Sequence, residues 1–124
     1  MARLKPVEWV GSSRSDIRSF PEEVREVMGE ALYRAQQGSE HPAARALKGF
    51  GGRGVIEIVG HYRGDTYRTI YTVRFENAIY VLHAFQKKSK KGIATPRHEI
   101  DLIKARLKRA EEHSRSHFYK EAGT

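Results

Sequence analysis

Basic side chains near the start of one predicted strand and at the end of the next suggest phosphate chemistry. Arg68 lies inside the first strand, at 67–75. The second strand, at 78–86, runs into four lysines within five residues, namely Lys87, Lys88, Lys90 and Lys91. A guanidinium binds phosphate oxygens in pairs, and lysines this dense repel one another unless an anion lies against them. We therefore expect a phosphodiester site with Arg68 as its clamp. The alternative is an ordinary sheet arginine that pairs with Glu57.

Aromatic residues accompany these basic ones, because Tyr62, Tyr67 and Phe85 are close by in the sequence. Mixed basic and aromatic surfaces suit single-stranded RNA, whose bases stack on rings. His83 has the intrinsic pKa of a general acid. Its neighbours Leu82, Ala84 and Phe85 are equally typical of a packed core histidine, so both interpretations remain open.

Other patterns indicate less chemistry. Four glycines in six residues, at 49–54, could cradle a phosphate, but the segment lacks Walker spacing and leads into a strand. His113 and His117 have i, i+4 spacing without a third ligand, which favours a solvated pair over a zinc site. We expect no metal and no cofactor.

The composition limits the class of protein. The 124 residues suffice for one domain, and 23 Lys+Arg against 15 Asp+Glu give a net charge of +8. Such a balance favours a polyanionic partner. The absence of cysteine excludes disulfides and thiolate chemistry. The sequence shows neither a signal peptide nor a run of ~18 apolar residues, so we expect a cytoplasmic protein with no membrane partner.

The predicted elements form one α+β domain over 1–124. A strand at 4–10, with Pro6 at a sheet edge, precedes a short helix that a Ser13–Asp16 capping box opens and that runs to Phe20. A second helix runs from Pro21 to Gly38, and 39–54 is predicted to be a loop. Strands at 55–62, 67–75 and 78–86 form an antiparallel meander, and a third helix runs from Pro96 to about 115. The order β-α-α-β-β-β-α packs helices on a small antiparallel sheet, and 117–124 is expected to fray.

Alternation along the strands assigns side chains to faces. It places Arg68, Ile70, Thr72 and Arg74 on one face of their strand. On the next strand it places Ile79, Val81, His83, Phe85 and Lys87 together.

Five motifs in this order resemble the HigB-like, phage-derived branch of the RelE/ParE toxin superfamily. They are LKG at 47–49, GVIEI at 54–58, YRTIY at 67–71, LHAFQKKS at 82–89 and TPRHEI at 95–100. The resemblance covers roughly 5–112. It implies a RelE-like fold and a type II toxin, a metal-independent endoribonuclease that cleaves mRNA at the ribosome and blocks translation. It also implies a HigA-like helix-turn-helix antitoxin and a toxin–antitoxin hetero-oligomer.

The resemblance assigns roles to individual residues. Arg68 falls where the family places the arginine that contacts the reacting phosphate, and Lys87 and Lys88 fall where it places a catalytic group near the carboxyl terminus.

His83 is the remaining catalytic candidate. The predicted RNA contacts are Lys90, Lys91, Arg63, Arg53, His61 and Arg97. Relatives often carry a basic residue where this chain has Val59, and His61, Arg63 or Arg53 are its candidate replacements. The alternative function is a non-catalytic basic module that binds nucleic acid or, as in the ParE branch, inhibits another enzyme.

Overall fold

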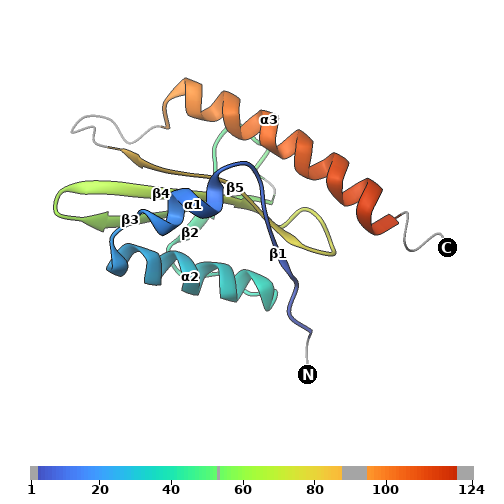
Figure 1. Cartoon of the computed structure of the whole chain (residues 1–124), viewed down its shortest axis with the longest axis horizontal. Helices are drawn as coiled ribbons and strands as arrows, with labels where there is room; N and C mark the ends of the chain where they lie inside the picture. The colour runs from blue at the N-terminus through green and yellow to red at the C-terminus, as the bar shows by residue number, and fades with distance from the viewer. Residues whose placement is uncertain (1–2, 53, 88–94, 120–124) are drawn as a thin grey trace.

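The computed structural model describes residues 3–52, 54–87 and 95–119, in which helices cover both faces of a small sheet (Figure 1). The strands are β1 (Val7–Trp9), β2 (Ala44–Ala46), β3 (Val55–Tyr62), β4 (Asp65–Thr72) and β5 (Ile79–Lys87). The helices are α1 (Ser13–Arg18), α2 (Glu22–Gln36) and α3 (Arg97–Ser114), and α3 ends in a π-helical turn at Arg115–Tyr119. The α+β class predicted from the sequence is confirmed.

The central meander has the predicted antiparallel pairing, but β4 spans Asp65–Thr72 and not 67–75. β3 pairs with β4 and β4 with β5, both antiparallel. Tyr62 faces Asp65 across a two-residue turn in which Arg63 and Gly64 have φ of 49° and 84°. Positive φ at both positions is the geometry that matches the twist of paired strands in a tight hairpin. The turn therefore places Arg63 at the tip of the hairpin.

The sheet is wider than the predicted antiparallel one and is mixed. Its order within the described residues is β1-β5-β4-β3-β2, and β1 runs parallel to β5. The prediction of a loop over 39–54 is wrong at β2, which pairs with β3 through Ala44–Ile58 and Ala46–Ile56. Pro6 does precede an edge strand, as expected, but that strand is only Val7–Trp9.

Two hydrophobic clusters lie on opposite faces of the sheet. Met28, Ala31 and Leu32 of α2 pack with Ile58 and Tyr71 on one face. Ile103 and Ala110 of α3 pack with Val55, Ile70, Tyr80 and Leu82 on the other. We call this second side the α3 face. The helical stripe predicted for α2 is buried except for Val27, which is half-buried, and Gly38 follows the helix at a φ of 83°.

The predicted capping box at Ser13 is wrong. Ser13 is a fully buried helical residue whose hydroxyl donates to the carbonyl of Val81 at 3.1 Å. The carboxylate of Asp16 instead accepts a 2.7 Å hydrogen bond from Ser12. Ser13 therefore ties α1 to β5, which a pattern based on local spacing alone does not anticipate.

A β-bulge in β5 changes the faces expected from alternation. Ile70 is paired with His83 and Tyr71 with Val81, which leaves Leu82 as an extra residue on β5. The prediction that Ile79, Val81, His83, Phe85 and Lys87 share one face is therefore wrong. Ile79 and Val81 lie on the α2 side, whereas His83 and Phe85 lie on the α3 face with Arg68. The bulge thus brings His83 and the end of β5 to the side that holds the arginine.

None of the helices in the described part of the chain combines the length and the apolarity needed to span a membrane.

Candidate functional site

A carboxylate between two arginines lies on the α3 face of the sheet. Arg68 of β4 donates from Nη1 to Oε2 of Glu57 on β3, and Arg45 of β2 donates from Nε to Oε1 of the same carboxylate at 3.1 Å. Arg68 and Glu57 are each only 4% exposed, whereas the side chain of Arg45 is 61% exposed. The pairing of Arg68 with Glu57, left open by the sequence, is confirmed. The three groups together carry one net positive charge.

Two surface depressions share these arginines. One, of about 340 Å³, is lined by Arg45, Arg68, Lys48 and Thr95, and the other, of about 430 Å³, by Arg45, Arg68, His61 and Thr66. Nη1 of Arg68 also lies 3.4 Å from the hydroxyl of Thr95, which precedes α3. Arg68 is thus buried among protein groups yet borders both hollows.

Two more side chains, those of His61 and Lys87, lie on this face nearer the β3–β4 hairpin. His61 and Lys87 both face Thr66 in the strand register, on the same side as Arg68. We call Arg45, His61, Arg68 and Lys87 the basic face. Arg63 lies beyond it at the hairpin tip, with its guanidinium 5.2 Å from the centre of the Tyr62 ring. Arg97 is an exposed residue at the start of α3.

The remaining predicted basic contacts fall elsewhere. Lys88, Lys90, Lys91 and Arg53 lie outside the described residues, so their predicted roles stay predictions. Val59 lies directly opposite Arg68 and lines the same depression as His61. His61 lies two residues further along β3 on the same face as Val59. Of the described residues proposed to replace a basic side chain at Val59, it is the one closest to that position along the strand.

Sequence reasoning missed Arg45. The residue belongs to the segment predicted to be a loop, and only the pairing of β2 with β3 sets it opposite Glu57. A carboxylate at Glu57, on a buried apolar strand, was the available clue, because a buried carboxylate requires cationic or hydrogen-bonding partners.

His83 packs beneath α3. Its Nδ1 accepts a hydrogen bond from Nη1 of Arg106 at 3.2 Å, and its Nε2 lies 3.3 Å from Oε1 of Glu99. Its ring stacks on Phe85 with centroids 5.0 Å apart. Burial lowers the pKa of His83, an effect that Glu99 opposes in part and Arg106 reinforces. These contacts are those of a packed, neutral histidine, and a role as general acid stays a prediction.

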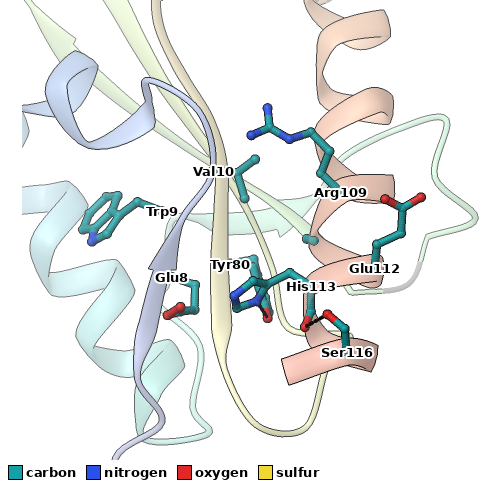
Figure 2. Close-up of a pocket in the computed structure, with 9 residues that line it drawn as sticks. Glu8, Trp9, Val10, Tyr80, Arg109, Glu112, His113 and Ser116 are labelled. Carbon is teal, nitrogen blue, oxygen red and sulfur yellow. Dashed lines mark hydrogen bonds between the residues drawn. The ribbon is translucent and has the colours of Figure 1, made fainter. Parts of the chain in front are cut away.

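A further pocket, of about 370 Å³, lies between β1 and the last turns of α3 (Figure 2). There the hydroxyl of Tyr80 lies 2.7 Å from Nδ1 of His113. Burial raises the pKa of Tyr80, and the charge of Glu8 adds to this effect. Figure 2 shows Trp9 on the other side of β1 from Tyr80 and His113. This pocket adjoins the carboxyl-terminal part of α3, whereas Thr95 and Arg68 adjoin the amino-terminal end.

Neither the His113 and His117 pair nor the glycine-rich segment forms a binding site in the described part of the chain. His113 and His117 stack at 5.0 Å, and the described residues contain no group of three or more side chains placed to hold a metal ion. The glycine-rich segment is held against the far end of β4, where the carbonyls of Phe50 and Gly54 accept hydrogen bonds from Arg74 and Thr72 at 2.7 Å each.

Comparisons with known proteins place the chain in a family. Residues 15–108 match the family model described as Phage derived protein Gp49-like (DUF891). No curated protein matches the chain. A solved structure, the toxin-antitoxin complex RelBE2 from Mycobacterium tuberculosis, is similar at 16% identity and a TM-score of 0.45, over 72% of this chain and 98% of that one. Because the family match extends from α1 into α3, the chain belongs to the phage-derived Gp49-like family.

Proposed function

We propose that this chain is the toxin of a type II toxin–antitoxin pair, a HigB-like, metal-independent endonuclease that cleaves mRNA at the ribosome. The observation that carries the proposal is the basic face, which brings Arg45, His61, Arg68 and Lys87 from four strands to one side of the sheet, with Arg45 and Arg68 bound to one buried carboxylate. Membership of a phage-derived family and the five ordered motifs support it. The proposed partner is a HigA-like helix-turn-helix antitoxin that covers this face.

The proposed reaction is attack by an RNA 2′-hydroxyl on the adjacent phosphate, with departure of the 5′-oxygen. The attacking hydroxyl loses a proton and the leaving oxygen gains one, so the transition state carries extra charge on the phosphate oxygens. Fixed cationic donors stabilise that charge best when they need not reorganise. Glu57 accepts one N–H from Arg45 and one from Arg68, which holds both guanidinium groups beside the same carboxylate.

The two arginines would then have different roles. Arg45, with 61% of its side chain exposed, would meet the phosphodiester from solvent. Arg68, buried on the central strand, would supply fixed positive charge beneath it. Lys87 would contact a neighbouring phosphate, since its partner in the register, Thr66, lies two residues from Arg68 on the same strand face.

A non-catalytic binding module is the second candidate, and one observation favours it. Arg68 is already ion-paired to Glu57, and both ring nitrogens of His83 face groups of α3. Such a face can hold RNA through Arg45 and Lys87 without transferring a proton.

Single-turnover cleavage of mRNA on programmed ribosomes tests the proposal. The parent should cleave, and Arg68→Lys, which keeps the charge but loses the planar fork, should cleave about 10²–10³-fold more slowly. Arg34→Lys is the matched control, because Arg34 is a half-exposed residue of α2 whose ion pair in the described part of the chain, with Glu30, lies within its own helix. A parent that binds RNA but cleaves nothing would leave the binding module as the function.

A further inference from the structure

A pocket of about 360 Å³ lies on the α2 side of the sheet, across from the basic face. Its described lining comes from the segment before β1, the end of α2 and the residues that follow it, and from β3, β4 and Val73. Ile56 and Tyr71 line it from the sheet as register partners. No residue of the basic face contributes to this described lining, so the pocket is separate from the proposed phosphate site.

Tyr71 brings an unpartnered hydroxyl to this pocket. The residue is only 1% exposed, and its hydroxyl makes no hydrogen bond within the described part of the chain. The hydroxyl is nevertheless not sealed from solvent. Because Tyr71 lines the pocket, the pocket is where this hydroxyl meets solvent. A polar group held in such a position favours an occupant that can bond it.

This hydroxyl is a hydrogen-bond donor at neutral pH. Burial raises the pKa of Tyr71 to about 12, and the charge of Glu40 adds to this effect. A phenol that stays protonated offers its O–H to an acceptor. The occupant that uses it best therefore presents an oxygen acceptor, either a carbonyl or a carboxylate.

The charges around the pocket favour a carbonyl over a carboxylate. Glu40 lies close enough for its charge to act on Tyr71, so it would repel a carboxylate bound there. The carboxyl end of α2, where Ala35 and Gly38 line the pocket, adds partial negative charge. An ammonium group suits these charges but has no acceptor for the O–H of Tyr71. A primary amide satisfies both requirements, because it joins a carbonyl oxygen to two N–H donors.

The rim of the pocket indicates where such an amide comes from. Val73 is 38% exposed in the lining, and Leu4, which precedes the lining residue Lys5, is 46% exposed. Exposed apolar side chains that border a pocket are typical of protein-binding surfaces. They disfavour the charged amino and carboxyl groups of a free amino acid, whereas a residue inside a chain joins its amide to an uncharged backbone.

We propose that this pocket binds the side-chain amide of a glutamine or asparagine in a partner protein. The amide oxygen accepts from the hydroxyl of Tyr71, and the amide nitrogen donates toward Glu40. The methylene groups of the side chain pack against Ile56 and Val73. This site does not depend on the proposed nuclease, since it lies on the other side of the sheet.

Titration of the nitrogen-15-labelled protein, followed by nuclear magnetic resonance, tests the site with capped single residues. N-acetylglutamine methylamide should shift the amide signals of Gly38, Tyr71 and Val73 with a Kd on the order of 1 mM, as expected for a ligand of this size. N-acetylglutamate methylamide has the same backbone amides but a carboxylate, and it should bind about three- to tenfold more weakly. Free glutamine should also bind more weakly than the capped residue.

Three variants identify the groups responsible. Tyr71→Phe should weaken binding of the glutamine probe about three- to tenfold, which is the loss of one hydrogen bond. Tyr33→Phe is the matched control, because Tyr33 is a 50% exposed residue of α2 that is not among the described lining. Glu40→Gln, an exposed change, should reduce the discrimination against the glutamate probe and keeps the test valid if Tyr71→Phe lowers stability.

The outcomes are decisive for the site and leave the nuclease to its own assay. Absence of saturable shifts at these residues, equal affinity for the two capped probes, or an unchanged affinity in a folded Tyr71→Phe would overturn the amide site. Free glutamine that binds as tightly as the capped residue would overturn the assignment to a partner protein. A preference for the capped glutamine that Tyr71→Phe removes supports the proposal whether or not the parent cleaves RNA.

Discussion

Replacing Arg68 by alanine should destabilise the fold because it leaves Glu57 buried with one partner fewer. Removing one member of a buried ion pair typically costs about 3–5 kcal/mol. Arg45 still donates to the other oxygen of Glu57 at 3.1 Å, so we expect the lower end, about 3 kcal/mol. That loss is a large part of the ~5–15 kcal/mol that stabilises a typical domain.

Two matched variants make the prediction specific. Arg45→Ala removes the other arginine, but that side chain is 61% exposed, so the loss should be within about 1 kcal/mol. The double variant Arg68→Met with Glu57→Met removes both buried charges and should recover most of the stability lost by Arg68→Ala.

The assay is equilibrium unfolding in urea at pH 7.5, followed by circular dichroism. Arg68→Ala should shift the midpoint far more than Arg45→Ala, with an unchanged denaturant slope. Equal losses in the two single variants, or a double variant no better than Arg68→Ala, would refute the electrostatic account of this site. A large loss would also make Arg68→Lys the proper variant for measuring cleavage.

Three further predictions concern titration and salt. Because the pKa of His83 is lowered from its ordinary 6.5, the unfolded chain binds a proton at this residue that the folded chain does not. The free energy of unfolding should therefore fall as the pH drops below about 6.5, by up to ~1.4 kcal/mol per pH unit. His83→Gln should remove this pH dependence. Burial, with Glu40, raises the pKa of Tyr71 to about 12, so deprotonation of Tyr71 in the unfolded chain should lower stability as the pH rises above its ordinary 10.0. Ultraviolet titration should show a phenol that ionises near pH 12, and Tyr71→Phe should abolish it. Lys87→Ala should reduce the slope of log affinity for RNA against log salt by about one unit, whereas Lys104→Ala, an exposed α3 change, should not.

The elements with strong local patterns were predictable from the sequence. The apolar stripe of α2 and the antiparallel order of β3, β4 and β5 appear as expected, although β4 begins and ends two to three residues earlier than predicted. β2 was not predictable, because three residues, Ala44–Ala46, carry no alternating pattern and form a strand only through β3. The parallel pairing of β1 likewise depends on contacts far along the chain.

The site was predictable only where alternation is unbroken. On β3 and β4 it places Glu57 and Arg68 on one face, and they do pair. On β5 the extra residue Leu82 shifts the pattern, so His83 lies against α3 and no longer with Val81. The sequence does not signal this bulge, because Leu82 is an apolar residue that packs in the α3 cluster, just as Val81 packs in the α2 cluster.

The central claim is most directly tested by expressing the chain in a bacterial host and mapping mRNA 5′ ends across the transcriptome, in parallel with Arg68→Lys. The account predicts growth arrest, new 5′ ends inside translated reading frames, and loss of both in the variant. Normal growth with abundant folded protein, or arrest without new 5′ ends, would contradict it.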